Sequence, residues 1–125
     1  MDANPPADIL VSDQPIDPAQ LRELVDRFFG DMVKLVVDVR RRLVAVGGEL
    51  HADAEAMLLE RDSKQADLWG ANYYPGLGPD DSLQFTALIN IRPAQDNPAM
   101  EVQDPAIREE MRAIAHELVG RGEPL

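Results

Sequence analysis

The sequence predicts an α+β fold: a mainly antiparallel sheet of about four strands with helices packed on one side of it. Three observations predict it, namely two helix starts followed by apolar stripes, a valine-rich run broken by arginines, and a later segment of strict alternation. They give the order helix, hairpin, helix, strand, strand, helix, which is typical of an α+β domain. With 125 residues and 45% hydrophobic content, we expect one domain over 9–120, a disordered N-terminal tail at 1–8 and a C-terminal tail at 121–125.

Three helices are predicted. Asp17-Pro18 and Asp104-Pro105 each place a capping carboxylate before a proline that suits the first helical position. Apolar residues follow both starts at spacings of three and four, and Gly30 and Gly120 supply the stops. A further helix is predicted over 50–61, because that segment is rich in alanine, leucine and methionine.

The strands are predicted from β-branched residues and alternation. Valine recurs through 33–46, which favours two strands joined as a hairpin at Arg40-Arg41-Arg42. One continuous helix is the competing interpretation, and the density of valine argues against it. The expected strands cover 33–40, 43–49, 68–74 and 83–91, with a short edge strand or a packed lead-in at 9–11.

Charge and composition exclude several classes of function. The net charge of −11 repels nucleic acid and anionic membrane surfaces, so we expect neither as a partner. No run reaches the roughly 18 apolar residues of a membrane span, and the first residues lack the apolar core of a secretory signal. The chain has no cysteine, which excludes disulfides and thiol nucleophiles. We therefore expect a cytoplasmic protein.

The segment Gly47–Glu55, with the sequence GGELHADAE, concentrates the residues that could carry chemistry. It holds one of the two histidines and three acids. In a helix, His51 neighbours Glu55 and Glu49 neighbours Asp53, whereas in a strand all four share one face. Either geometry could build a divalent metal site from His51, Asp53 and Glu55, or orient a general base. The alternative is a solvated helix start whose acids complement the helix dipole.

A second group of polar residues lies in predicted strands, where such residues are disfavoured. Asn72 lies in 68–74, and Asn90 and Arg92 share one face near the end of 83–91. Arg92 could bind a carboxylate or phosphate in bidentate fashion. The alternative is that these side chains satisfy buried backbone groups, or that Arg92 pairs with an acid such as Asp53. No serine–histidine–aspartate pattern, phosphate loop or histidine-rich zinc motif is present.

Four short motifs together resemble a family of small bacterial proteins that is known only as a domain of unknown function. The resemblance covers roughly residues 9–119. Members of that family carry a glycine in the hairpin turn and after the second helix, where this chain has its arginine run and Asp62. The resemblance implies no activity, but it groups the four motifs into one constellation. The motifs are Val36-Val37-Asp38, Gly47–Glu55, Leu68-Trp69-Gly70-Ala71-Asn72 and Ile89-Asn90-Ile91-Arg92-Pro93.

Two hypotheses for function follow, and the sequence leaves open whether the protein is an enzyme. The first is a binding or regulatory module that contacts a protein partner or a small polar ligand. The second is a metal-assisted hydrolase that uses His51 with Asp53, Glu55 or Glu49. A homodimer formed through an exposed strand edge is a third, independent expectation. The binding surface expected under the first hypothesis comprises Glu49, His51, Asp53, Asn72, Asn90 and Arg92.

Overall fold

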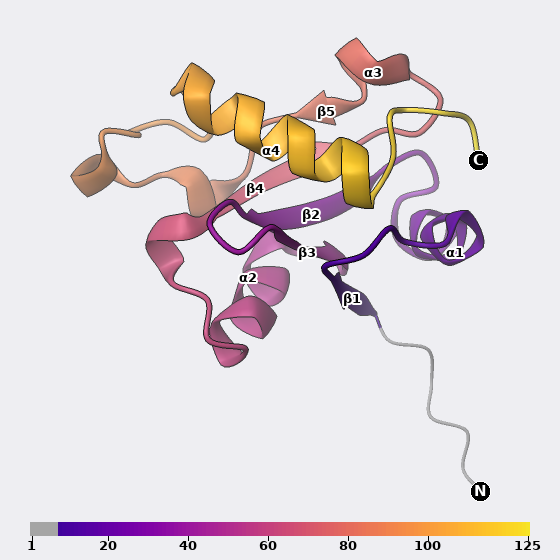
Figure 1. Ribbon diagram of the computed structural model, residues 1–125, viewed down its shortest axis with the longest axis horizontal. Coiled ribbons are helices and arrows are strands. Elements are labelled where there is room, and N and C mark those ends of the chain that lie inside the picture. The colour runs from indigo at the N-terminus through magenta and orange to yellow at the C-terminus, as the bar shows by residue number, and fades with distance from the viewer. Residues whose placement is uncertain (1–7) are drawn as a thin grey trace, which may run out of the picture.

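The computed structural model describes residues 8–125 and contains a five-stranded antiparallel sheet in the order β1-β3-β2-β4-β5 (Figure 1). The predicted α+β class and the predicted order of elements are confirmed, and the sheet has five strands rather than about four. Residues 1–7 of the expected tail lie outside the described residues. The strands are β1 (Ile9–Ser12), β2 (Val33–Asp38), β3 (Leu43–Gly47), β4 (Leu68–Tyr73) and β5 (Leu83–Gln84), and the helices are α1 (Pro18–Phe28), α2 (His51–Glu60), α3 (Gly78–Asp81) and α4 (Pro105–Leu118).

Both Asp-Pro starts form the predicted caps. Asp17 accepts a hydrogen bond from the backbone N–H of Ala19 (2.8 Å), and Asp104 accepts one from that of Ala106 (2.9 Å). Each carboxylate satisfies a helix N–H that has no partner inside the helix. The two helices therefore begin where the sequence predicts.

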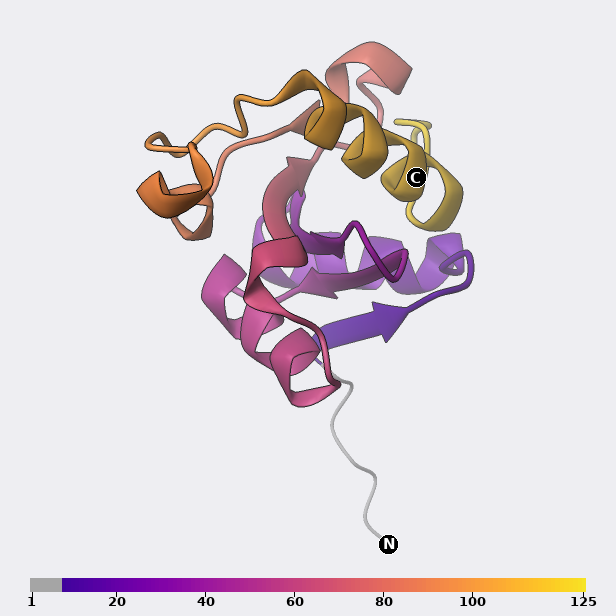
Figure 2. The same ribbon diagram turned by 60° about the vertical axis from the view of Figure 1, so that its left-hand side comes forward.

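The helices cover both faces of the sheet, which corrects the expectation that they pack on one side. Leucines and valines of α1 and residues of α4 such as Ile114 pack against one face, around Leu35 and Val44. Ala54 and Leu58 of α2 pack against the other face. Figure 2 shows α4 and α2 on opposite sides of the strands. Because β2 is buried on both faces, the apolar residues Leu35, Val36 and Val37 follow one another instead of alternating with polar ones.

The strand predicted over 83–91 is wrong beyond Gln84. β5 pairs with β4 only at Asn72↔Gln84 and Tyr73↔Leu83, and a 3₁₀ turn at Leu88–Asn90 follows. Side chains take the place of a strand along the rest of this edge of β4. The Asn90 amide accepts from the N–H of Gly70 (2.8 Å) and donates to its carbonyl (3.0 Å), and Arg92 donates to the carbonyl of Leu68. The alternating pattern therefore belongs to a loop whose polar side chains complete the sheet.

The two turns where glycine was expected from the resemblance use other residues in the same conformation. Arg42 has a φ of 55° and Asp62 a φ of 73°, both in the left-handed region. Asp38 is buried beside them and accepts from the N–H groups of Arg40 (3.0 Å) and Arg41 (2.9 Å). Its other carboxylate oxygen accepts from the Ser63 hydroxyl (2.6 Å), which ties the hairpin turn to the end of α2.

The segment 121–125, expected as a tail, returns to the sheet. The backbone N–H of Gly122 donates to the hydroxyl of the buried Tyr73 (2.8 Å), and the N–H groups of Gly76 and Gly78 donate to the carbonyl of Gly122 (both 3.0 Å). The end of the described chain is therefore held against β4 and α3.

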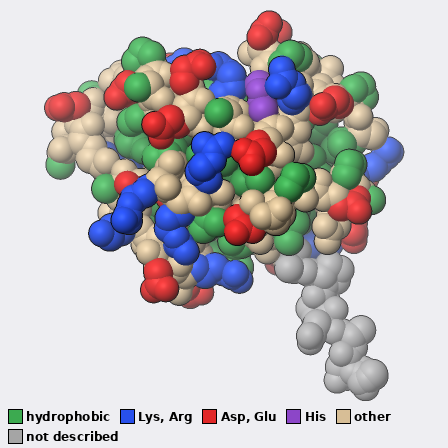
Figure 3. Space-filling model, in the orientation of Figure 1, with side chains coloured by type: hydrophobic (Ala, Val, Ile, Leu, Met, Phe, Trp, Pro, Cys, Tyr) green, Lys and Arg blue, Asp and Glu red, His purple; other side chains and the backbone are tan. Residues whose placement is uncertain are grey.

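Charged side chains of both signs cover the surface. On the face drawn in Figure 3, acidic and basic groups are interspersed with hydrophobic ones. The charge of −11 is therefore not gathered into one acidic field on this face. Within residues 8–125, no helix has the length and apolar character needed to cross a membrane.

Candidate functional site

The candidate site is a groove on the sheet face that α2 covers only in part. Ala54 and Leu58 of α2 cover Val36, Ala45 and Leu68. Next to the start of α2, a row of polar residues crosses the three neighbouring strands β2, β4 and β5 on this face. Lys34 of β2 pairs with Asn72 of β4, and Asn72 pairs with Gln84 of β5.

The walls of the groove are mostly apolar. Its volume is about 500 Å³, which lies in the range of small-molecule sites. Leu50, at the start of α2, and Leu88 and Met100 of the loop 86–100 line it. Leu88 is 70% exposed and Leu50 57%, so two leucines stand open to solvent at its mouth. Exposed aliphatic side chains that gather around a concave surface mark a binding site more often than scattered ones do.

His51 is the first residue of α2 and lies in the wall of the groove. Its Nε2 lies 2.9 Å from the carbonyl oxygen of Ala71. A carbonyl can only accept, so we assign the ring proton to Nε2, which leaves Nδ1 with a free lone pair. Burial lowers the pKa of His51, the hydrogen bond to Ala71 opposes this, and the charge of Lys34 lowers the pKa further. The imidazole is therefore neutral at pH 7 and offers an acceptor.

Gly70 allows His51 to approach the sheet. A Cβ atom at position 70 would lie 2.6 Å from the Cβ of Ala87 and 3.2 Å from Cδ2 of His51. Contacts under 3.0 Å between such atoms do not occur without movement of one of them. The missing side chain therefore lets α2 and the loop 86–100 meet over β4.

Asn72 lies at the floor of the groove with one polar atom unpaired. The side chain is 8% exposed, and its Nδ2 donates to Gln84 Oε1 (2.9 Å). Its Oδ1 is buried and receives no hydrogen bond from the described residues. A hydrogen bond between the side chains of His51 and Asn72 raises the pKa of the imidazole, because the amide oxygen can accept only from the protonated ring, but the effect of burial is larger. A buried acceptor without a donor is uncommon and is a candidate for ligand recognition.

Glu49 and Asp53 lie apart from this groove. Both border a smaller hollow of about 340 Å³ beside Phe28 and Gly48. The backbone carbonyl of Glu49 accepts from Lys34 Nζ (2.8 Å), which fixes the lysine at the edge of the main groove. The contribution of Glu49 to the groove therefore comes through its main chain.

Asn90 and Arg92 are committed to backbone groups, as the alternative interpretation describes. Arg92 is buried with its guanidinium 4.3 Å above the ring of Trp69. It donates to the carbonyls of Gln65 (2.6 Å) and Ile89 (3.0 Å), besides that of Leu68. Together with Asn90 it holds the loop that carries Leu88. The structure thus brings His51 and Asn72 into one groove and uses Asn90 and Arg92 to support its wall.

The metal ligands expected from the sequence do not converge. Across residues 8–125, no group of three or more histidine, aspartate or glutamate side chains is arranged to hold a metal ion. His51 lines the main groove, Asp53 borders the neighbouring hollow, and Glu55 is half-buried on α2. The divalent metal site stays a prediction.

Local sequence patterns predict the apolar walls of the groove less well than His51 and Asn72. Lys34, Leu50, Leu88 and Met100 were not among the expected site residues. One signal was present: Leu88 is apolar at a position where alternation places a polar residue. The groove depends on the shape of the loop 86–100, which local patterns do not encode.

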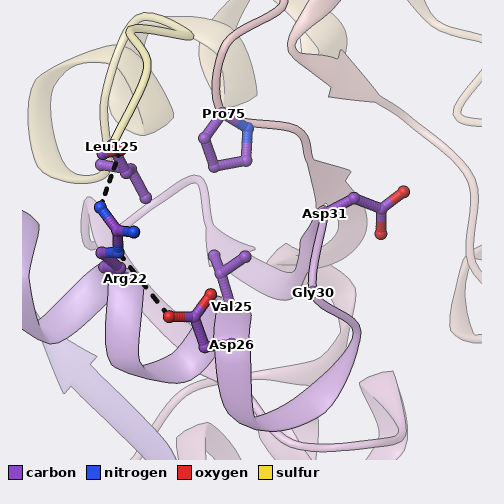
Figure 4. Close-up of a pocket in the computed structure, with 7 residues that line it drawn as sticks. All are labelled: Arg22, Val25, Asp26, Gly30, Asp31, Pro75 and Leu125. Atoms are coloured by element: carbon purple, nitrogen blue, oxygen red, sulfur yellow. Dashed lines mark hydrogen bonds and ion pairs between the residues drawn. The ribbon is translucent and has the colours of Figure 1, made fainter.

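A further pocket, of about 240 Å³, lies between α1 and the end of the described chain (Figure 4). Arg22 donates to the carbonyl of Leu125 (3.0 Å) and lies 3.7 Å from the carboxylate of Asp26. The figure shows the arginine reaching both partners. Because these polar groups satisfy one another, this pocket is a weaker candidate than the groove.

Comparisons with known proteins agree with the resemblance. One family model, described as "Protein of unknown function (DUF5674)", matches residues 10–118. No curated protein and no solved structure matches the chain. The predicted membership of a domain family of unknown function is confirmed, and the bacterial origin stays a prediction.

Proposed function

Because the chain belongs to the DUF5674 family, whose function is unknown, we propose a function from the structure alone: the protein is a binding module whose ligand occupies the groove. One observation carries this proposal. A mostly apolar groove of about 500 Å³ ends at a neutral imidazole and an unpaired amide oxygen. A concave apolar site with few convergent polar groups is the usual form of a small-molecule site.

Three of the four motifs have distinct parts in this proposal. The segment that follows Gly47-Gly48 supplies Leu50 and His51, and β4 supplies Asn72. The segment Ile89–Pro93 holds the loop that carries Leu88 through Asn90 and Arg92. The sequence leads to the expectation of a protein partner or a small polar ligand, and the aliphatic walls support a small ligand with an apolar body.

The test uses Nile red, an uncharged dye whose fluorescence rises in an apolar environment. Wild-type protein should bind the dye, and Leu88→Glu should weaken binding by at least about tenfold, because a charge at the mouth of an apolar site must be desolvated. Leu88 is highly exposed, so this change should leave folding intact.

Leu77→Glu is the matched control. Leu77 is 55% exposed and lies outside the groove, so this variant should bind the dye as the wild type does. Equal loss in both variants, or full binding by Leu88→Glu, would contradict the proposal.

A further inference from the structure

The polar end of the groove offers acceptors whose own donors are already used. Nε2–H of His51 is directed at the carbonyl of Ala71, and Nδ2 of Asn72 donates to Gln84. What remains is the Nδ1 lone pair of His51 and the buried Oδ1 of Asn72, which receives no hydrogen bond within the described part of the chain. A ligand that fits this end must therefore bring hydrogen-bond donors.

A hydrogen-bond donor, the ammonium of Lys34, lies on the same floor as these acceptors. Lys34 is the cross-strand neighbour of Asn72, with its side chain on the same face of the sheet. Its ammonium gives one N–H to the carbonyl of Glu49 and lies 5.2 Å from the centroid of the Phe29 ring. An ammonium carries three N–H donors, so two remain for a ligand acceptor.

We propose that the ligand is an uncharged molecule with an apolar body and a carboxamide head, whose N–H groups donate to Asn72 and His51 and whose carbonyl accepts from Lys34. This inference rests on the proposed function of the groove. The head group carries two donors and an acceptor on one planar unit, which matches two acceptors and one donor at the floor. The apolar body lies between Leu50, Leu88 and Met100.

Charged head groups satisfy this end less well. A carboxylate would accept from Lys34 but would leave both acceptors without a donor, and would face their lone pairs. A primary ammonium would donate to both acceptors but would lie beside the ammonium of Lys34. Sites built to bind an N–H group discriminate strongly against analogues that lack it, because their own polar groups are left unpaired.

The experiment compares four probes that share a six-carbon chain: hexanamide, methyl hexanoate, hexanoate and hexylammonium. Binding is followed by chemical-shift changes in amide spectra of the protein and by the ¹⁵N shift of His51 Nδ1. Hexanamide should bind at least about tenfold more tightly than methyl hexanoate, which keeps the carbonyl and lacks the donors. The Nδ1 signal should move with hexanamide and should not move with methyl hexanoate or hexanoate, which bring no N–H donor.

Two substitutions at one position separate the acceptor from the rest of the side chain. Asn72→Leu removes Oδ1 and should abolish the preference for hexanamide over the ester. Asn72→Asp keeps an acceptor in the same place, so the preference should persist and hexylammonium should gain affinity. Thermal unfolding checks that both variants fold. The comparison of the four probes on the wild-type protein tests the proposal even if a variant does not fold.

The outcomes separate the two proposals. Equal affinity for hexanamide and methyl hexanoate at the groove, or tighter binding of hexanoate, would overturn the carboxamide head and leave the binding module intact. Failure of every probe to shift groove residues at the solubility limit would overturn both. Tightest binding of hexanamide, lost in Asn72→Leu, would support both.

Discussion

The two faces of the sheet differ in what they bury. The face under α1 and α4 buries aliphatic and aromatic side chains in one continuous core, which includes Trp69 and Tyr73. The face under α2 has a much smaller apolar cluster and buries Asp38, His51 and Asn72 beside it. Apolar burial is the main source of folding free energy, whereas buried polar groups stabilise only when each finds a partner. The comparison indicates that the first face supplies stability and the second tolerates a site.

The largest expected effect lies on the first face. Ile114 of α4 is fully buried, so Ile114→Ala should lower the free energy of unfolding by about 2–5 kcal/mol through lost burial and a cavity. Urea denaturation followed by circular dichroism measures it. Leu59→Ala, at a 41% exposed position of α2, should cost less than about 0.5 kcal/mol. Similar losses in the two variants would remove the distinction between core and surface on which the comparison depends.

The next effect concerns the edge of β4. Arg92→Lys keeps the charge but cannot reach several carbonyls at once, so buried carbonyls such as that of Gln65 lose their donor. We expect a loss of about 1–3 kcal/mol in unfolding free energy. Arg40→Lys, at an exposed position of the hairpin turn, is the control and should be neutral. An unchanged Arg92→Lys protein would show that the guanidinium does not support the loop.

A smaller effect depends on pH. Burial holds the pKa of His51 in the folded protein below its ordinary value of 6.5, so the unfolded chain binds more protons as the pH falls. The stabilising contribution is therefore complete above pH 6.5 and decreases as the pH falls below it. Burial also lowers the pKa of His116, so the wild type is compared with His51→Gln and His116→Gln separately. Equal pH dependence of the unfolding free energy in wild type and His51→Gln would contradict the buried, neutral imidazole.

The smallest effect is expected where a core substitution usually costs most. Asn72→Leu loses the hydrogen bond to Gln84 but also removes a buried acceptor that has no donor. These contributions oppose each other, so we expect a change within about 1 kcal/mol of zero in either direction. A loss above about 3 kcal/mol in urea denaturation would mean that Oδ1 is satisfied in the folded protein, and the groove would lack its free acceptor.

Local signals were sufficient for the first face and insufficient for the second. The caps at Asp17 and Asp104 and the stripes behind them identify α1 and α4, because both signals lie within a few residues of the chain. The face on which α2 packs is not readable from the sequence of β2, since apolar residues lie on both faces of that strand. That choice is made by tertiary packing.

Two polar residues of the groove were predictable from the sequence, whereas Lys34 and the apolar walls were not. His51 and Asn72 were expected to share a surface, and the structure places both in the groove. The strand predicted over 83–91 failed because alternation is a local property, whereas a strand needs a partner. Here Asn90 already occupies the hydrogen-bonding groups of Gly70, so no strand is required there.

The bonds between Asn90 and Gly70 have a consequence for how the protein behaves in solution. A central length of β4 is shielded from other chains by one amide side chain rather than by a neighbouring strand. Open strand edges recruit further strands and lead to aggregation. Removing that amide would therefore expose β4 to intermolecular pairing, so the same contact that shapes the groove also keeps the molecules separate.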